Sequence, residues 1–148
     1  MKIINKKFYR DYEEIESFEA GIVLTGSEVK SIKNGGLKLE DSYVKLLDDG
    51  VYLINANIPK YKFDNDKNYN PTRSRKLLLK KKEILKLATK MKVGGLTIAP
   101  KSCYNKGSIL KLEIALVRGR KDIEKRKLEK EKDIKREENK EIKEYLKR

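Results

Sequence analysis

The chain has 148 residues, a length typical of one domain, and carries 37 Lys and Arg against 23 Asp and Glu, a net charge of +14. With no histidine and one cysteine, it excludes an internal disulfide, a cysteine-based zinc site and histidine-dependent catalysis. No apolar run reaches the ~18–20 residues that span a bilayer, and the first residues lack the apolar core of a signal peptide. We therefore expect a cytoplasmic protein. Its positive charge predicts binding to nucleic acid or to an anionic membrane surface.

The charge divides the chain into two unlike parts. Residues 1–119 hold 24 basic and 14 acidic residues, a net charge of +10, together with most of the apolar residues. Residues 120–148 hold 13 basic and 9 acidic residues, a net charge of +4, so that 22 of 29 positions are charged. We therefore expect a folded domain over residues 1–119 and a basic tail over residues 120–148.

The first expected elements are a strand and a short helix. The apolar residues of 20–24 predict a strand in which Gly21 is a bulge or a point of close approach. A helix is expected next, with Ser27 as its N-cap and Glu28 near the positive end of its dipole. The run Asn34-Gly35-Gly36 is expected to end it.

A hairpin and a loop are expected after this helix. Residues 42–47 and 51–58 are rich in β-forming side chains and flank Asp48-Asp49-Gly50, a good hairpin signal. Residues 59–75 are polar and contain two prolines, which predicts a mobile loop.

A second helix and a second hairpin complete the expected domain. Apolar residues recur at helical spacing over residues 82–93, before Gly94-Gly95. Residues 96–104 and 108–117 predict a hairpin, whose last strand alternates apolar and charged side chains as a half-buried antiparallel strand does. Because hairpins dominate, we expect a mainly β fold with peripheral helices, a small antiparallel barrel that is closed or partly open.

The tail contains no Pro or Gly, so nothing prevents a helix. Its six larger apolar side chains would occupy an arc of about 140° on a helical wheel. So few apolar residues cannot offset the cost of ordering the backbone. We therefore expect a tail that is disordered when free and helical when bound.

Basic clusters indicate contacts with phosphate. Residues 73–82 alternate basic side chains with three leucines, which predicts leucines packed inward and basic side chains presented outward, either to phosphate or as a solubilising rim. Residues 6–10 mix cations with aromatic rings, as base stacking requires, although such rings also cover barrel ends. The same two interpretations, stacking or packing, apply to four tyrosines: Tyr43, Tyr52, Tyr61 and Tyr69.

No pattern predicts an enzyme. The glycine pairs lack the spacing of a phosphate-binding P-loop, and Cys103 has no CxxC partner or histidine to activate it. The clustered Glu13, Glu14, Glu16 and Glu19 are interpreted as a solvated stretch rather than an acid pair. We therefore expect no catalytic residue, no metal site and no cofactor.

An ordered series of motifs over nearly the whole chain resembles the SsrA-binding protein family, also called small protein B. The motifs are Asn5-Lys6-Lys7, Asp11-Tyr12, Phe18 to Ile32, Asp41-Ser42-Tyr43-Val44, Asn55-Ala56-Asn57-Ile58, Pro71 to Leu79, Leu96-Thr97, and Arg118-Gly119-Arg120-Lys121. The resemblance implies a barrel of the oligonucleotide-binding type. It also implies binding to the tRNA-like domain of transfer-messenger RNA and delivery of that RNA to stalled ribosomes, with the tail replacing codon–anticodon pairing in the decoding centre and the mRNA channel.

The resemblance assigns roles residue by residue. Asn5 and Glu28 match RNA-binding positions of the family, with Lys30 beside the latter. The ribosome-engaging residues would be Gly119, Arg120, Lys121, Glu124, Lys125 and Arg126. Together with the basic clusters, the expected RNA-binding set is Asn5, Lys6, Lys7, Arg10, Glu28, Lys30, Arg73, Arg75 and Lys76.

Some positions depart from the family pattern. Ile123 stands where a His or Tyr is usual, Glu124 replaces an Asp, and Arg10 replaces a His. For Glu28, two roles remain open, an acid that stabilises a helix N-terminus or a carboxylate that accepts from a base. Besides a rescue factor acting as a monomer, a generic RNA-binding module, an RNA-modifying enzyme and a membrane-surface protein are the alternatives.

Overall fold

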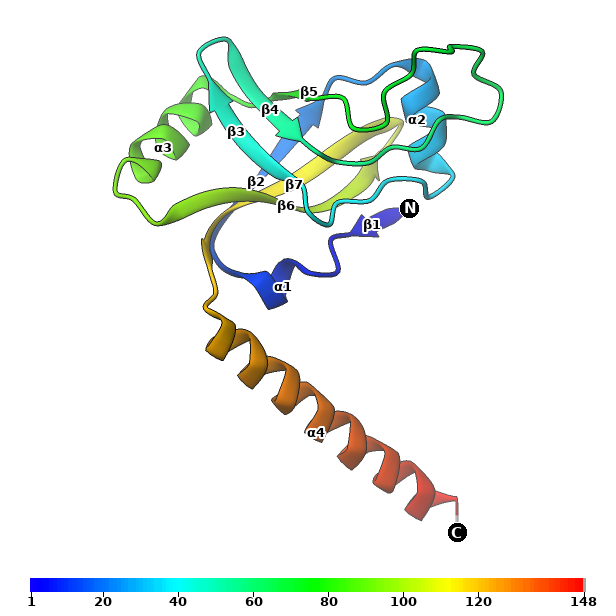
Figure 1. The fold of residues 1–148 in the computed structure, drawn as a ribbon, viewed down its shortest axis with the longest axis vertical. Coiled ribbons are helices and arrows are strands. Elements are labelled where there is room, and N and C mark those ends of the chain that lie inside the picture. Colours follow the sequence, from blue (N-terminus) through cyan, green and yellow to red (C-terminus); the bar gives the residue numbers. More distant parts are fainter. Residues whose placement is uncertain (148) are drawn as a thin grey trace.

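Six strands close into a barrel in the computed structural model, which describes residues 1–147 (Figure 1). The elements are β1 (Lys2–Ile4), α1 (Phe8–Asp11), β2 (Tyr12–Ile22), α2 (Gly26–Lys33), β3 (Tyr43–Leu47), β4 (Gly50–Ile54), β5 (Arg75–Leu78), α3 (Lys81–Met91), β6 (Leu96–Lys106), β7 (Ile109–Gly119) and α4 (Asp122–Leu146). The strand order is β1-β6-β3-β4-β5-β2-β7, and an additional β6–β7 pairing closes the ring. The expected antiparallel barrel with peripheral helices is confirmed.

Both expected hairpins and both expected helices are present. β3 pairs with β4 across the predicted turn, and β6 pairs with β7 around Gly107, whose φ is +65°. In α3, Leu87 is fully buried, and Ile84 and Met91 pack against the same core. Gly21 is a point of close approach, because a Cβ there would lie 3.2 Å from the Cβ of Leu78 on β5.

β2 is longer than the sequence pattern predicts, since it begins at Tyr12 and not near Ala20. Its glutamates interrupt the apolar pattern by which a strand is recognised. Each of them faces a cation on a neighbouring element, which offsets the local negative charge. The pairs are Glu13 with Arg118, Glu14 with Lys101, Glu16 with Lys86 and Lys90, and Glu19 with Lys106. The acidic stretch is therefore a surface ion-pair network.

The second half of β7 is buried on both faces, which corrects the expectation of a half-buried strand. Ala115 and Val117 form a second small core with Phe8 of α1 and Ala99 of β6, and Tyr12 packs against it. The aromatic ring of Phe8 is fully buried. The opening aromatics thus cover the outside of the barrel at this point.

The sequence pattern predicts neither β1, α1 nor β5 as regular elements. They contain three or four residues each, too few to show a hydrophobic period. β5 begins at Arg75, inside the segment expected to be loop. The rest of that segment is a loop held at its base by hydrogen bonds, among them one from the Ile58 N–H to the Pro71 carbonyl (3.0 Å).

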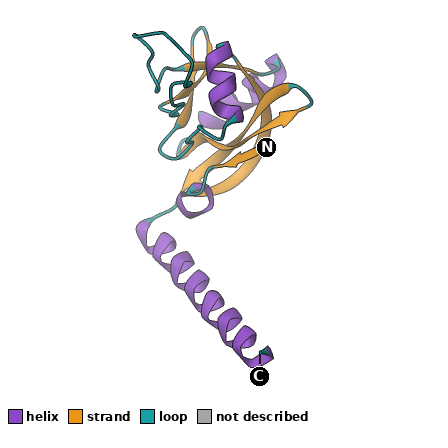
Figure 2. Cartoon of the chain, turned by 90° about the vertical axis from the view of Figure 1, so that its right-hand side faces the viewer, coloured by secondary structure: helices purple, strands orange, loops and turns teal. Residues whose placement is uncertain are grey.

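α4 projects from the barrel as one straight helix with no buried residue (Figure 2). Its base is attached to α1 by polar contacts: Arg10 Nε lies 2.6 Å from a Glu129 carboxylate oxygen, and Lys125 Nζ lies 3.7 Å from one of Asp11. None of the helices within residues 1–147 combines the length and apolar character needed to cross a bilayer. The tail is thus helical in this structure. The division into two parts at residues 119/120 stays a prediction.

An isolated peptide of residues 120–148 should show little helix in plain buffer, because it has only i,i+4 ion pairs worth about 0.2–0.5 kcal/mol each and no packing partner. Circular dichroism measures this directly. Adding a polyanion such as ribosomal RNA should raise the helix signal, whereas strong helicity without it would contradict the predicted disorder.

Candidate nucleic-acid interface

α2 begins with a capping box formed by Thr25 and Glu28. The Thr25 hydroxyl accepts from the Glu28 N–H (3.3 Å), and Glu28 Oε1 accepts from the Thr25 N–H (3.0 Å). Thr25 has the extended backbone of an N-cap. The expectation that Ser27 is the N-cap is therefore wrong. The T-x-x-E spacing carries the signal for the true cap.

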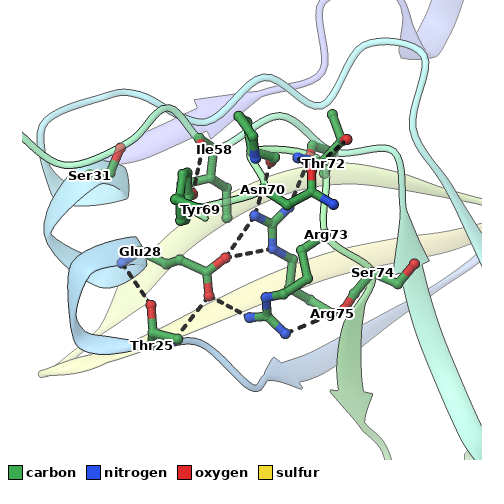
Figure 3. Close-up of polar contacts among 12 residues, drawn as sticks. Thr25, Glu28, Ser31, Ile58, Tyr69, Asn70, Thr72, Arg73, Ser74 and Arg75 are labelled. Atoms are coloured by element: carbon green, nitrogen blue, oxygen red, sulfur yellow. Dashed lines mark hydrogen bonds and ion pairs between the residues drawn. The ribbon is translucent and has the colours of Figure 1, made fainter. Parts of the chain in front are cut away.

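The Glu28 carboxylate lies between two arginines of the segment that enters β5 (Figure 3). Arg73 Nη2 donates to Oε1 (2.5 Å), while Nε (2.8 Å) and Nη2 (2.7 Å) of Arg75 both lie on Oε2. Including the Thr25 N–H, Oε1 accepts two hydrogen bonds, and Oε2 accepts one from Arg75 Nε and lies in an ion pair with Nη2 of the same guanidinium. Glu28 therefore joins α2 to a segment 45 residues away in the chain.

Arg75 is fully buried and extends this connection in two further directions. Its Nη1 donates to the Ala56 carbonyl (2.7 Å) and its Nη2 to the Pro71 carbonyl (3.0 Å). The guanidinium thus connects α2, the segment that follows β4 and the last part of the loop. Since a buried charge must be paired and hydrogen-bonded, this role depends on Glu28.

These positions correct two expectations. Arg75 does not point outward with the other basic side chains of residues 73–82, because its guanidinium pairs with Glu28 in the interior. The side chain of Glu28 is 0% exposed and paired with two arginines, so its carboxylate is not accessible to a base. Of the two roles left open for Glu28, the structure favours the helix N-terminal acid.

The pKa of Glu28 reflects this environment. Burial alone would raise the pKa, but the hydrogen bond from Thr25 and the two guanidiniums lower it below its ordinary value of 4.5. The carboxylate is therefore charged at neutral pH, as its pairing with arginine requires.

Arg73, Lys30 and Lys76 are exposed around this buried network. The Arg73 side chain is 43% exposed. Its Nη2 is bound to Glu28 and its Nη1 makes a long hydrogen bond to the Ser74 carbonyl (3.4 Å), and the remaining edge of the guanidinium is open to solvent. Lys30 is on α2, and its Nζ lies 5.4 Å from the ring centroid of Tyr61. Lys76 follows Arg75 on β5 and points out of the barrel. These three cations can contact phosphate.

The opening segment repeats the pattern of one buried polar residue beneath exposed cations. Asn5 is buried, its Nδ2 donates to the Pro100 carbonyl (2.9 Å), and its Oδ1 accepts from the Lys7 N–H (3.2 Å). Lys6, Lys7 and Arg10 are exposed. A shallow hollow between β1 and the segment after α2 runs beside them, lined by Lys2, Lys6, Lys38 and Glu40 among others.

The nine expected RNA-binding residues thus separate into two kinds. Asn5, Glu28 and Arg75 are buried and position their neighbours. The remaining six side chains are exposed cations: Lys6, Lys7, Arg10, Lys30, Arg73 and Lys76.

The four tyrosines singled out in the sequence also differ in position. The hydroxyl of Tyr69 donates to the Ile58 carbonyl (2.6 Å), and that of Tyr52 donates to Asp49 (2.8 Å). Tyr43 is exposed on β3. Tyr61 lies edge-on to Phe63, a residue that the sequence analysis does not single out. The sequence signal for Phe63 is an aromatic residue that directly follows Lys62 in a polar loop.

The tail residues begin where β7 ends at Gly119. The Arg120 N–H donates to the Asp11 carbonyl (2.8 Å), and its Nε donates to the carbonyls of Tyr9 and Tyr12. Lys121, Glu124 and Arg126 are exposed, while Lys125 faces Asp11. Ile123 is also exposed, at 79%.

Cys103 does not have the environment of a nucleophile. It is buried in β6, and burial raises the pKa of its thiol to about 11. The thiol is therefore protonated at neutral pH.

The chain was compared with known proteins. The family model of the SmpB protein matches residues 2–144. The SsrA-binding protein of Sulfurihydrogenibium sp. (strain YO3AOP1) is 51% identical over 97% of this chain and 94% of its own length. That of Thermosipho africanus (strain TCF52B) is 46% identical over 100% of this chain and 99% of its own length. A chain of the solved structure described as "tmRNA-SmpB: a journey to the center of the bacterial ribosome" is 38% identical, with a TM-score of 0.67 over 82% of this chain and 85% of that one.

Glu28→Gln should destabilise the fold by about 3 kcal/mol at neutral pH, because it leaves a buried guanidinium without its counter-charge. Urea denaturation followed by circular dichroism measures the change. Since the folded-state pKa of Glu28 is lowered, its contribution is present above the unfolded value of 4.5 and lost as pH falls through the folded pKa. The difference in the free energy of unfolding between wild type and Glu28→Gln should therefore become smaller in acid.

Glu138→Gln, exposed on α4, is the matched control and should leave stability unchanged. Equal stability of Glu28→Gln and wild type at neutral pH would refute the role of Glu28 as the central ion-pair partner.

Proposed function

The chain belongs to the SmpB protein family, and from that premise we propose that it is a non-enzymatic binding partner of transfer-messenger RNA. In this proposal the protein binds the tRNA-like domain and delivers that RNA to ribosomes stalled on incomplete messages. It acts in the cytoplasm and as a monomer. The observation that best supports this proposal is the set of exposed cations around α2, β5 and the opening segment, which buried polar residues hold in place.

Arg73 shows how such an arrangement supports RNA binding. Its guanidinium is oriented by Glu28 before any RNA arrives, so less side-chain freedom is lost when its open edge meets a phosphate. Lys30 and Lys76 add positive charge on the adjacent helix and strand. A rigid set of cations can recognise the shape of a folded RNA through its phosphates, without reading a sequence.

Asn5 would serve the second part of the interface in the same way. Its side chain ties the turn after β1 to the Pro100 carbonyl, and so determines where Lys6 and Lys7 project. In this proposal Asn5, Glu28 and Arg75 act on RNA by positioning residues that touch it. Loss of Asn5 or Glu28 would then weaken binding although neither side chain is free to contact a base.

The tail is proposed to engage the ribosome, standing in for codon–anticodon pairing in the decoding centre and extending into the mRNA channel. Support comes from its charge and its accessibility: Lys121, Glu124 and Arg126 are exposed at the base of a helix that stands clear of the barrel. A helix whose basic side chains, apart from Lys125, face solvent can enter a groove walled by ribosomal RNA. Arg120 and Lys125 would set its direction through their contacts with α1.

The decisive test is binding of the full chain to the tRNA-like domain of transfer-messenger RNA, with an equal-length tRNA as competitor at near-physiological salt. Selective binding that survives the competitor is the expected result. Indiscriminate binding that collapses with added salt would instead identify a generic polyanion binder.

Arg73→Met should weaken this binding several-fold and reduce the slope of log affinity against log salt by roughly 1, because one phosphate contact is lost. Filter binding over a salt series measures both quantities. Arg136→Met, on the exposed surface of α4, removes the same charge elsewhere and should leave the affinity for this RNA fragment unchanged. Equal effects of the two variants would show that only net charge matters.

Truncation after Gly119 should separate the two proposed activities. The shortened chain keeps the barrel and should bind the tRNA-like domain as the full chain does. It should fail to support peptide tagging on stalled ribosomes in a reconstituted translation system. Tagging at the wild-type rate without residues 120–148 would refute the proposed role of the tail.

A further inference from the structure

The loop between β4 and β5 carries two neighbouring aromatic rings, one half-buried (Tyr61) and one exposed to solvent (Phe63). Tyr61 and Phe63 lie with their ring centroids 5.5 Å apart and their planes at 68°. Phe63 is 70% exposed. Neither ring belongs to the hydrophobic core clusters. Leaving the Phe63 ring in water forfeits the stabilisation that burial would give, so this exposed ring beside a half-buried one indicates a surface that is covered in a complex.

The rings are accompanied by cations. Lys30 Nζ lies 5.4 Å from the centroid of Tyr61, and Lys62 Nζ lies 5.4 Å from that of Phe63. The loop's own acids serve the backbone: Asp64 accepts from the Asp66 N–H (2.9 Å), and Asp66 accepts from the Asn68 N–H (2.9 Å). Aromatic rings beside ammonium groups suit a ligand with flat π faces and negative charge.

The base of the loop is tied to the same framework that orients Arg73. Ser31 Oγ on α2 donates to the Pro59 carbonyl (2.6 Å), and Arg75 donates to the Pro71 carbonyl (3.0 Å). One hollow beside α2 is lined by Arg73 together with five residues of the loop: Asp64, Asp66, Asn68, Tyr69 and Asn70. A strand whose phosphate meets the open edge of Arg73 is therefore next to the loop that carries the rings.

We propose that Tyr61 and Phe63, with Lys30 and Lys62 beside them, form a stacking platform for unpaired nucleobases of the bound RNA. This inference rests on the proposed function and adds to it a ligand class, bases in single-stranded loops as opposed to paired helix. The rings supply the π surface on which a base stacks, and the lysines neutralise the adjoining phosphates.

The test uses the full chain and tRNA-like-domain RNAs in which 2-aminopurine replaces one base in each unpaired loop in turn. Wild type should quench the fluorescence of at least one probe on binding. The double variant Tyr61→Leu with Phe63→Leu should lose that quenching and bind about 10-fold more weakly. The variant Tyr61→Phe with Phe63→Tyr keeps both rings and should behave as wild type. Thermal melting verifies that each variant is folded.

A second probe separates this inference from the proposed function. An unstructured single-stranded RNA carrying 2-aminopurine should be quenched by wild type and by the ring-retaining variant, but not by the leucine variant, whether or not the tRNA-like domain is the natural ligand. If wild type binds the single-stranded RNA but not the tRNA-like domain, the proposed function is refuted and the platform is not. Equal binding and quenching by wild type and the leucine variant on both RNAs would overturn the platform and indicate that the rings contact protein.

Discussion

The surface around α2 depends on the ionised carboxylate of Glu28. It accepts hydrogen bonds from the start of its own helix and from two arginines that follow a long loop. Removing these charges from water is costly, and the arrangement is tolerated because the carboxylate is both paired with two guanidiniums and hydrogen-bonded through both oxygens. Without Glu28, Arg75 would be a buried cation and Arg73 a flexible one. A single side chain thereby joins the stability of the barrel to the geometry of its surface.

The same division between buried and exposed polar groups separates two properties of an RNA-binding protein. Exposed lysines and arginines supply attraction to phosphate, which any polyanion satisfies and which salt weakens. Buried residues such as Asn5 and Glu28 determine where those charges are held. Specificity for a folded RNA would then arise from the spacing of charges rather than from their number. In the proposed interface, this would be the physical reason that an acidic residue lies among so many basic ones.

The parts of the fold that could be predicted from sequence are those with a local signal. The two hairpins have turn residues between β-rich runs, and α3 has its apolar residues at helical spacing. The first half of β2 could not be recognised, because its glutamates are neutralised by lysines that are distant in the chain. Arg75 resembles its exposed neighbours for the same reason: only the position of Glu28 in space distinguishes it.

The candidate site follows the same rule. Motif resemblance selects Asn5, Glu28 and the basic residues as a group, but it does not tell which of them are buried. That distinction depends on backbone carbonyls, such as those of Ala56 and Pro100, which have no sequence signature. The ring pair of Tyr61 and Phe63 depends likewise on how a polar loop folds back onto α2.

The polar attachment of α4 has a consequence for how such a protein can change over generations. The helix spans 25 residues, about 38 Å at 1.5 Å per residue, yet none of them is buried. Substitutions along most of its length therefore leave the free energy of folding of the barrel nearly untouched. The length, charge and partner contacts of the tail can therefore change independently of the core. Ile123 and Glu124, which depart from the family pattern, are substitutions that cost the fold little stability.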